Sequence, residues 1–236
     1  MRVIKHWDNN NWLSSREYIN QINNFILKQS RLKKTSNVLD IGCGRGKIIG
    51  NLYFQLNLIN KPVGIDLINH KDKHKKIDFK KIDGLSYFKK NKKKFDLILI
   101  KQTIHLFKLN RIKKLIKCCK RSLNKNGVIL IFTLDPYKNE MPSFKLMKQE
   151  LYKSFQKDKM ITKLLIKSKT KKNFKKFSYE VKIDKVKYLK MLKKRFISIL
   201  LTMSDKEILN GIKEIKSQFK TILKFNDNLI CIILKK

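Results

Sequence analysis

A short apolar run that leads into a cluster of glycines is the feature that most restricts how this chain can fold. Residues 37–41 (NVLDI) have the composition of a buried strand, and residues 42–46 (GCGRG) carry glycine at every second position. Residues 47–57 then resume the spacing of apolar side chains that is typical of a helix. Residues 62–66 (PVGID) form a second apolar run that ends in a carboxylate. This order predicts a βαβ unit, which requires a parallel sheet with a right-handed crossover.

The alternation of strands and helices continues as far as residue 134. Three further apolar runs have the length of strands, and the stretches between them have helical spacing or turn composition. These predicted strands cover residues 79–82, 95–100 and 128–132. We therefore predict an α/β fold whose core is residues 37–134.

The remaining segments are predicted to flank this core within a single domain of 236 residues. Residues 1–36 contain an amphipathic helix and are predicted to form a helical lid. Residues 135–201 break the alternation and are interpreted as an insertion between the fifth and sixth strands. Residues 202–236 contain a capping box, followed by two apolar runs that flank Asn226-Asp227-Asn228. They are predicted to form a final helix and a terminal hairpin.

The chain is strongly basic, with 57 Lys and Arg against 18 Asp and Glu and a formal net charge of +39. Such a charge favours a polyanionic partner, for example nucleic acid or an anionic membrane surface. Only 7 of the basic residues are Arg, the residue preferred for bidentate phosphate and guanine recognition. The lysine excess is therefore open to two interpretations: a selected polyanion-binding surface, or compositional drift in an AT-biased genome.

Targeting and metal-binding signals are not visible in the sequence. The N-terminal residues lack the apolar run of a signal peptide, and no segment has about 18 consecutive apolar residues. We therefore expect a cytoplasmic protein. The four cysteines show no CxxC spacing, so the sequence predicts reduced thiols and no metal site.

The acids around the glycine loop predict the type of ligand. The glycine pattern differs from the GxGxxG of dinucleotide-binding loops, and Asp40 lies two residues before the first glycine. An acid at this position disfavours a pyrophosphate and favours a cationic, amine-bearing ligand. Asp66 ends the second predicted strand, where a carboxylate can hold ribose hydroxyls. The pattern thus predicts a positively charged nucleoside, and S-adenosylmethionine is such a ligand.

Residues 38–46 (VLDIGCGRG) resemble the glycine-rich first motif of the class I S-adenosylmethionine-dependent methyltransferases. The resemblance covers residues 37–132 and the last strand, but not residues 135–201. It implies a Rossmann-like, seven-stranded, mainly parallel sheet with an antiparallel terminal strand. The insertion of residues 135–201 is expected to shape the pocket of the methyl acceptor.

The same resemblance implies a set of cofactor-binding residues. The acid at the end of strand two binds ribose and the next residue packs on adenine, while an acid after strand three meets the adenine edge. The residues after strand four line the methionine end of the cofactor. In this chain these positions are Asp40, Gly42, Cys43, Gly44 and Gly46 in the first motif, then Asp66, Leu67, Asp83, Gly84, Lys101 and Gln102.

The motifs of nucleic-acid methyltransferases are not found at the expected places. Enzymes that methylate exocyclic amines carry (D/N/S)PP(Y/F) after strand four, where this chain reads KQTIH at residues 101–105. Methylation of cytosine carbon requires a nucleophilic cysteine near the cofactor, and Cys118 and Cys119 fall on a predicted helix instead. The sequence therefore favours a small-molecule acceptor, and the basic surface would suit an anionic one. An RNA or protein methyltransferase and a non-catalytic nucleic-acid-binding protein remain alternatives.

Several aromatic and imidazole side chains are candidates for the acceptor side. His105 is interpreted either as a base that removes an acceptor proton or as a structural residue at a strand-to-helix junction. Trp7, Trp12 and Tyr18 either cover the cofactor or pack the N-terminal segment onto the sheet. The insertion is expected to wall a closed pocket with the aromatic residues Tyr152, Phe155, Phe174, Phe177 and Tyr179.

Overall fold

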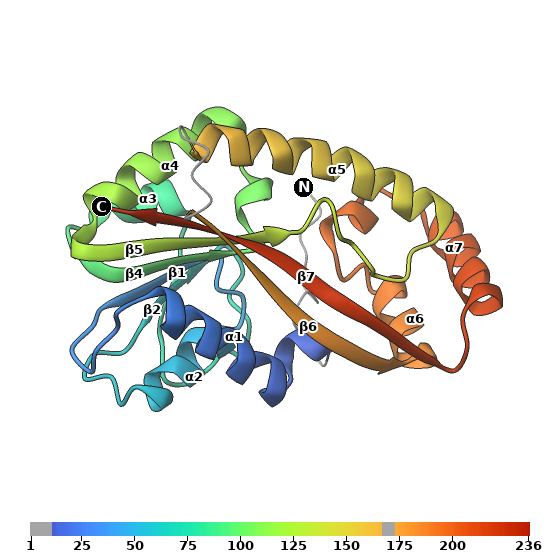
Figure 1. Ribbon diagram of the computed structural model, residues 1–236, viewed down its shortest axis with the longest axis horizontal. Coiled ribbons are helices and arrows are strands. Elements are labelled where there is room, and N and C mark those ends of the chain that lie inside the picture. Colours follow the sequence, from blue (N-terminus) through green and yellow to red (C-terminus); the bar gives the residue numbers. More distant parts are fainter. Residues whose placement is uncertain (1–10, 167–172) are drawn as a thin grey trace.

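The computed structural model describes residues 11–166 and 173–236, which form one seven-stranded sheet with helices on both faces (Figure 1). Its strand order is β3-β2-β1-β4-β5-β7-β6. The strands are β1 (Val38–Ile41), β2 (Val63–Asp66), β3 (Asp78–Lys81), β4 (Phe95–Lys101), β5 (Leu123–Leu134), β6 (Phe174–Asp184) and β7 (Ile222–Lys235). The first five strands are parallel, and β7 is antiparallel to both β5 and β6. The predicted α/β fold and its antiparallel terminal strand are confirmed.

Helices separate the parallel strands as the apolar spacing predicts, except between β2 and β3, which are joined by a loop. The main helices are α1 (Arg16–Gln29), α2 (Lys47–Gln55), α3 (Gly84–Lys90), α4 (Leu109–Arg121), α5 (Lys145–Leu165), α6 (Lys185–Lys193) and α7 (Asp205–Gln218). Short 3-10 turns are η1 (Trp12–Ser14), η2 (Ile104–Leu106) and η4 (Ser198–Leu201). Two apolar clusters lie on opposite faces of the sheet, one under α1 and α2 and the other under α3 and α4.

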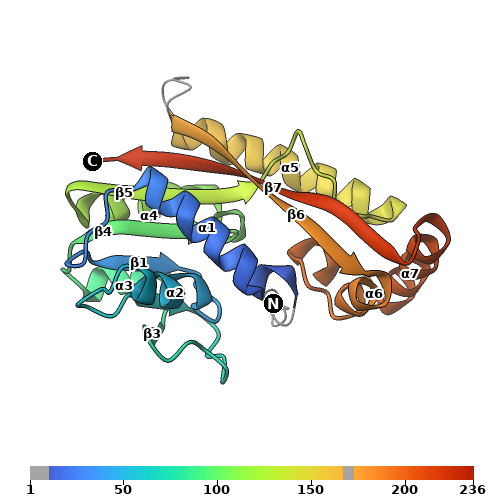
Figure 2. The ribbon, with the colours of Figure 1, turned by 60° about the horizontal axis from the view of Figure 1, so that its bottom comes forward.

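The N-terminal segment packs on one face of the sheet. Ser15 caps α1 by accepting a hydrogen bond from the backbone N–H of Tyr18. Tyr18, Ile22 and Ile26 have no exposed surface, because the apolar side of α1 lies against the sheet. In Figure 2, α1 runs across the sheet from β5 towards β6. Trp7 lies outside the described residues, and the expectation that residues 1–36 act as a lid stays a prediction.

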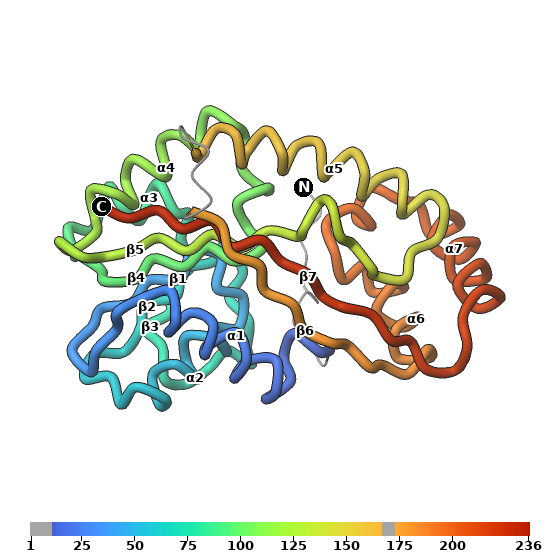
Figure 3. The backbone as a smooth tube through the Cα atoms, in the orientation of Figure 1, coloured from blue at the N-terminus to red at the C-terminus, as the bar shows by residue number. Residues whose placement is uncertain are grey.

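The predicted terminal hairpin is wrong, because β7 is one continuous strand from Ile222 to Lys235. Residues 222–232 of this strand pair with β6 and residues 229–235 pair with β5, so that the strand passes between the two, as the path of the backbone in Figure 3 shows. The polar residues Asn226 and Asn228 bond to Glu140, and Asn228 also accepts from Ser178. These tertiary partners satisfy a polar triplet that has the composition of a turn.

Residues 135–201 are not wholly an insertion, which corrects the boundary expected from the sequence. They contain β6, whose alternating side chains pair with β7 from Phe174 to Asp184. Helix α5 connects β5 to β6, whereas α6, η4 and α7 connect β6 to β7. We call β6, β7, α6, η4 and α7 the arm, because in Figure 1 they extend beyond the parallel strands.

Residues 124–127 (NKNG) have a composition that predicts a turn, and this prediction is wrong. They belong to β5, which begins at Leu123 and has an irregularity opposite Phe95 and Leu97 on β4. Within the described residues, no helix combines the length and the apolar character needed to cross a membrane.

Candidate functional site

The glycine loop between β1 and α2 has the backbone geometry that its sequence predicts. Gly42, Gly44 and Gly46 have φ angles of +76°, +55° and +67°, in the left-handed region that side chains disfavour. A Cβ atom on Gly42 would lie 2.3 Å from Oγ1 of Thr103. The loop therefore depends on glycine both for its backbone conformation and for its close approach to the segment after β4.

A narrow hollow of about 30 Å³ opens beside this loop. It is lined by Leu13, Asp40, Gly42, Cys43, Lys47, Ile48 and Lys101. Four of the predicted cofactor-binding residues thus lie together, at the carboxyl ends of β1 and β4, where open parallel sheets bind their ligands. A ligand larger than one or two water molecules has to displace part of the lining. Leu13 comes from the N-terminal segment and covers the hollow from outside the sheet.

Asp40 is the buried acid of this hollow. Its side chain is 4% exposed, and Oδ1 has no hydrogen-bond partner. Burial raises the pKa of Asp40 to about 8, although the charge of Lys101 opposes the rise, and the nearby Asp66 adds to it. A buried carboxylate with an unused oxygen is a receptor for a cation, because a positive ligand supplies the missing charge and hydrogen bond.

Asp66 fastens the glycine loop to the end of β2. One carboxylate oxygen accepts the N–H of Gly44 at 2.8 Å, and the other accepts the N–H of Ile68 at 3.0 Å. A carboxylate accepts about four hydrogen bonds, so each oxygen retains capacity for a hydroxyl group. The next residue, Leu67, is 58% exposed and presents apolar surface beside that carboxylate. The binding of ribose by Asp66 and of adenine by Leu67 stays a prediction.

Asp83 and Gly84 lie at the start of α3 and do not line the hollow. Asp83 caps this helix by accepting the N–H of Ser86 at 2.9 Å, and it forms an ion pair with Arg111. Burial alone would raise the pKa of Asp83, but the Ser86 N–H and the Arg111 guanidinium outweigh burial and hold it below the usual value. The structure therefore gives Asp83 a capping role, and its contact with adenine stays a prediction.

Lys101 and Gln102 end β4 at the edge of the hollow. The Lys101 side chain is 8% exposed, and its ammonium lies 5.2 Å from the centre of the Tyr18 ring. Gln102 has a left-handed backbone with φ +56° and donates its N–H to the carbonyl of Phe132. Strained backbone of this kind is concentrated at ligand sites. Lys101 lines the hollow as predicted, whereas Gln102 lies next to it in the chain.

His105 lies in η2 and does not line the hollow. Burial, and then the charge of Lys157, lower the pKa of His105 to about 4. The imidazole is therefore neutral at physiological pH, and it is a weak base. The Lys157 ammonium donates to the His105 carbonyl, which ties η2 to α5. A catalytic role for His105 stays a prediction.

The aromatic residues expected to wall one closed pocket do not gather around one. Tyr152 is 64% exposed and borders a shallow surface depression on α5, which no predicted site residue lines. Phe177 and Tyr179 pack edge-on against Tyr18, and Phe155 is buried in the core. Phe174 packs on the apolar cluster of the opposite face of the sheet. The five aromatic residues therefore do not wall one pocket, and that part of the prediction is wrong.

The structure adds one acid that the sequence analysis assigned to a turn. Asp227 is 5% exposed in the middle of β7, and it accepts a hydrogen bond from the Trp12 indole at 3.1 Å. Burial raises the pKa of Asp227, while Lys101 and the Trp12 hydrogen bond lower it. Apolar residues stand two and four positions before and after Asp227, which is compatible with one continuous strand that has Asp227 on its inward face; these residues are Leu223, Phe225, Leu229 and Cys231.

Comparisons with known proteins identify the family and the fold of this chain. The family described as a methyltransferase domain matches residues 14–168. Among proteins of curated function, none matches the chain significantly in sequence.

Three solved structures share the fold. A protein described as a methyltransferase of an antibiotic biosynthesis pathway in Anabaena variabilis has a TM-score of 0.64 and 16% identity, over 91% of this chain and 97% of its own. A SAM-dependent methyltransferase from Archaeoglobus fulgidus has a TM-score of 0.53 and 20% identity, over 94% and 95%. A protein from Bacillus halodurans, also described as a methyltransferase, has a TM-score of 0.50 and 14% identity, over 91% and 98%.

The family match spans more than half of the chain, including β1 to β5 and the whole glycine loop. The strand order, the left-handed glycines and the acids at the carboxyl ends of β1 and β2 are in keeping with it. This chain therefore belongs to the methyltransferase domain family.

Proposed function

We propose that this protein transfers the methyl group of S-adenosylmethionine to an oxygen, nitrogen or carbon atom of a small-molecule acceptor. One observation carries the methyl-donor part of the proposal. The buried Asp40 carboxylate has an unpartnered oxygen and lines a hollow beside a glycine loop that leaves the backbone uncovered. S-adenosylmethionine brings two cationic groups, a sulfonium and an ammonium, attached to a nucleoside.

Each part of this ligand has a residue of fitting chemistry. Asp40 receives the cationic amino-acid end, and Asp66 holds ribose hydroxyls with the lone pairs that Gly44 and Ile68 leave free. Leu67 offers exposed apolar surface to the adenine. When bound, the donor supplies a methyl group that is already activated by the positive sulfur. The protein contributes orientation and the exclusion of water, for which Leu13 covers the hollow.

The small-molecule part of the proposal rests on the segment after β4 and on the state of a buried cysteine in α4. Residues 101–105 (KQTIH) lack the paired prolines and the aromatic residue that hold an exocyclic amine of a base. Burial raises the pKa of the Cys119 thiol, so that this cysteine is kept protonated and is unsuited to nucleophilic attack on a base. The structural neighbour from an antibiotic biosynthesis pathway is in keeping with a small-molecule acceptor.

The net charge of +39 favours a second candidate, methylation of RNA or of an acidic protein. Incubation with labelled S-adenosylmethionine and, separately, total RNA, total protein and a metabolite extract distinguishes the two. We expect label in the metabolite fraction, with little dependence on salt. Stoichiometric labelling of one RNA species that weakens steeply with salt would favour the second candidate.

Calorimetry with S-adenosylhomocysteine tests the methyl-donor site. Asp66→Ala removes charge-assisted hydrogen bonds worth about 1.5–3 kcal/mol each, so we expect affinity to fall by about tenfold to a hundredfold. Asp78→Ala is a matched control, because Asp78 is exposed on the neighbouring strand β3. Unchanged affinity in Asp66→Ala, or no binding by the unmodified protein, would refute the assignment.

A further inference from the structure

Asp40, Lys101 and Asp227 lie on one face of the sheet, although they come from three different strands. Lys101 follows Leu97 and Leu99 in the alternation of β4, and these two residues belong to the apolar cluster under α1. Lys101 is opposite Phe132 on β5, which in turn is opposite Cys231 on β7. Asp227 is four residues before Cys231, so its side chain is on the same face.

These three charged side chains are withdrawn from water. Asp40 is 4% exposed, Lys101 8% and Asp227 5%. Buried charges persist where opposite charges and hydrogen bonds compensate them. The charge of Lys101 counteracts the rise that burial causes in the pKa of both acids. One cation is thus shared by two carboxylates, of which only Asp40 lines the hollow.

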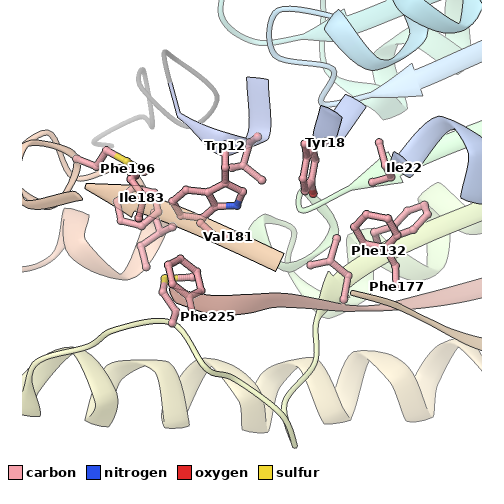
Figure 4. Close-up of a cluster of buried hydrophobic side chains, with 14 of the residues drawn as sticks. Trp12, Tyr18, Ile22, Phe132, Phe177, Val181, Ile183, Phe196 and Phe225 are labelled. Carbon is pink, nitrogen blue, oxygen red and sulfur yellow. The ribbon is translucent and has the colours of Figure 1, made fainter. Parts of the chain in front are cut away.

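The surroundings of Asp227 fix its position. The Trp12 indole N–H donates to its carboxylate, and Tyr179 is opposite it on β6. Tyr179 packs edge-on against Tyr18, whose ring lies under the Lys101 ammonium. Figure 4 shows that Trp12 and Tyr18 belong to a cluster of buried hydrophobic side chains. The N-terminal segment and the last strand together hold the groups around Lys101.

One buried polar atom beside the hollow, Asp40 Oδ1, has no hydrogen-bond partner. Unsatisfied buried polar atoms are rare in folded proteins, and a ligand site is one place where they occur. The hollow also has opposite charges on its lining, the Asp40 carboxylate and the Lys101 ammonium. This pair is complementary to a zwitterionic α-amino acid group, which presents an ammonium and a carboxylate together.

We propose that Asp227 is a positioning residue that acts through Lys101, holding its ammonium ready to bind the carboxylate of the methyl donor's amino-acid end. The inference rests on the proposed function. Asp227 supplies the negative charge that balances Lys101 from the side away from the hollow. Without it, Lys101 pairs with Asp40, and the two groups that the zwitterion needs neutralise each other.

The test compares two probes that differ in the amino-acid end. S-adenosylhomocysteine carries the ammonium and the carboxylate, whereas 5′-methylthioadenosine has the same nucleoside and thioether without them. Calorimetry measures both probes on the unmodified protein, Lys101→Met and Asp227→Asn. We expect each variant to bind S-adenosylhomocysteine about tenfold or more weakly, with the affinity for 5′-methylthioadenosine changed by less than about twofold.

The controls separate positioning from fold stability. Asp205→Asn makes the same chemical change at a side chain that is 97% exposed, and we expect it to leave both affinities unchanged. Asp227→Glu keeps a negative charge at this position. We expect it to retain part of the affinity for S-adenosylhomocysteine that Asp227→Asn loses, with the affinity for 5′-methylthioadenosine unchanged. If Asp227→Asn fails to fold, Trp12→Phe removes the hydrogen bond to Asp227 while it retains an aromatic ring, and it is expected to weaken S-adenosylhomocysteine binding selectively.

Four outcomes would overturn the inference. A lower melting temperature with an unchanged ratio of the two affinities would give Asp227 a purely structural role. An equal loss for both probes in Lys101→Met would mean that the hollow as a whole has collapsed. If Lys101→Met leaves the ratio of the two affinities unchanged but lowers the turnover of carboxylate-bearing acceptors, Lys101 binds the acceptor instead. Failure of the unmodified protein to bind either probe would refute the proposed function, and the inference with it.

Discussion

Acidic side chains are held differently in the parallel half of the sheet, which is β1 to β5, and in the arm. In β2 and the segment after β3, Asp66 and Asp83 lie where a strand ends, and each binds nearby backbone N–H groups. In the arm, Asp227 lies in the middle of a 14-residue strand and bonds to an indole from the other end of the chain. Acids at strand ends are held by local geometry, whereas an acid within a strand depends on distant partners.

The N-terminal segment joins the two regions. Trp12 packs edge-on against Phe196 and Phe225 of the arm, at ring-centre distances of 5.8 and 5.4 Å. The next residue, Leu13, lines the hollow of the parallel half. Changes in the arm are therefore expected to reach the ligand site through residues 12–18. Four variants or conditions test how separate the two regions are.

The largest expected effect is on stability, at the joint between the regions. Trp12→Ala removes a side chain that is 8% exposed, together with its hydrogen bond to Asp227. Loss of a buried aromatic residue costs about 3–5 kcal/mol, so we expect a melting temperature lower by about 10 °C or more. Trp12→Phe retains an aromatic ring, so we expect its melting temperature to fall clearly less. Equal melting temperatures for the unmodified protein and Trp12→Ala would show that the joint is unimportant for stability.

The next effect is confined to the parallel half. Gly42→Val places a β-branched side chain at φ +76° and against Thr103. We expect the affinity for S-adenosylhomocysteine to fall by about a hundredfold or more, while the circular dichroism of the sheet is retained. Calorimetry and circular dichroism on the same sample measure both quantities. Normal affinity in a folded Gly42→Val protein would reduce the loop to an ordinary turn.

A third effect depends on pH. The pKa of Asp40 is about 8, so below this pH its carboxyl group is mostly protonated and binds a cation poorly. Affinity for S-adenosylhomocysteine is therefore expected to increase as pH rises towards 8, by at most about tenfold per unit, with release of a proton. Above pH 8 this increase levels off. Calorimetry over the pH series measures the slope, and Asp40→Asn should abolish it; the same slope in that variant would assign the titration to another group.

The smallest effect concerns Asp83. Asp83→Ala removes the cap of α3, worth about 1 kcal/mol, and the exposed ion pair with Arg111. Arg111→Met removes only the ion pair, so we expect it to cost about 0.5 kcal/mol or less. Because Asp83 does not line the hollow, both variants should retain their affinity for S-adenosylhomocysteine. Weakened binding in Asp83→Ala alone would instead place this carboxylate against the adenine, as the family resemblance implies.

The methyl-donor site was largely predictable because its determinants are close together in the chain. The glycines, Asp40 and Asp66 belong to one βαβ unit, and Gly44 contacts Asp66 directly. The sequence correctly places Asp83 just after β3, but it does not show whether this carboxylate caps α3 or binds a ligand. An Asp before a helix has both uses, and the local sequence is the same for each.

The arm was harder to predict because its strands are stabilised by residues that are remote in sequence. The residues 226–228 have turn composition, and their pairing with β6 together with their bonds to Glu140 and Ser178 makes a continuous strand favourable. Phe177 and Tyr179 alternate as strand residues do, but their packing against Tyr18 depends on where α1 lies. Aromatic residues give no signal of whether they face a ligand or a neighbouring helix.

The sequence by itself determined the parallel core, the order of strand, glycine loop and helix, and the acids at the ends of the first strands. Periodicity and glycine conformation are local properties, so a segment of ten to thirty residues encodes them. Only the tertiary structure decided that β7 passes between β5 and β6, and that Asp227 shares one face with Lys101 and Asp40. These relations arise from strand pairing and helix packing between distant segments, and no local pattern specifies the partner of a strand.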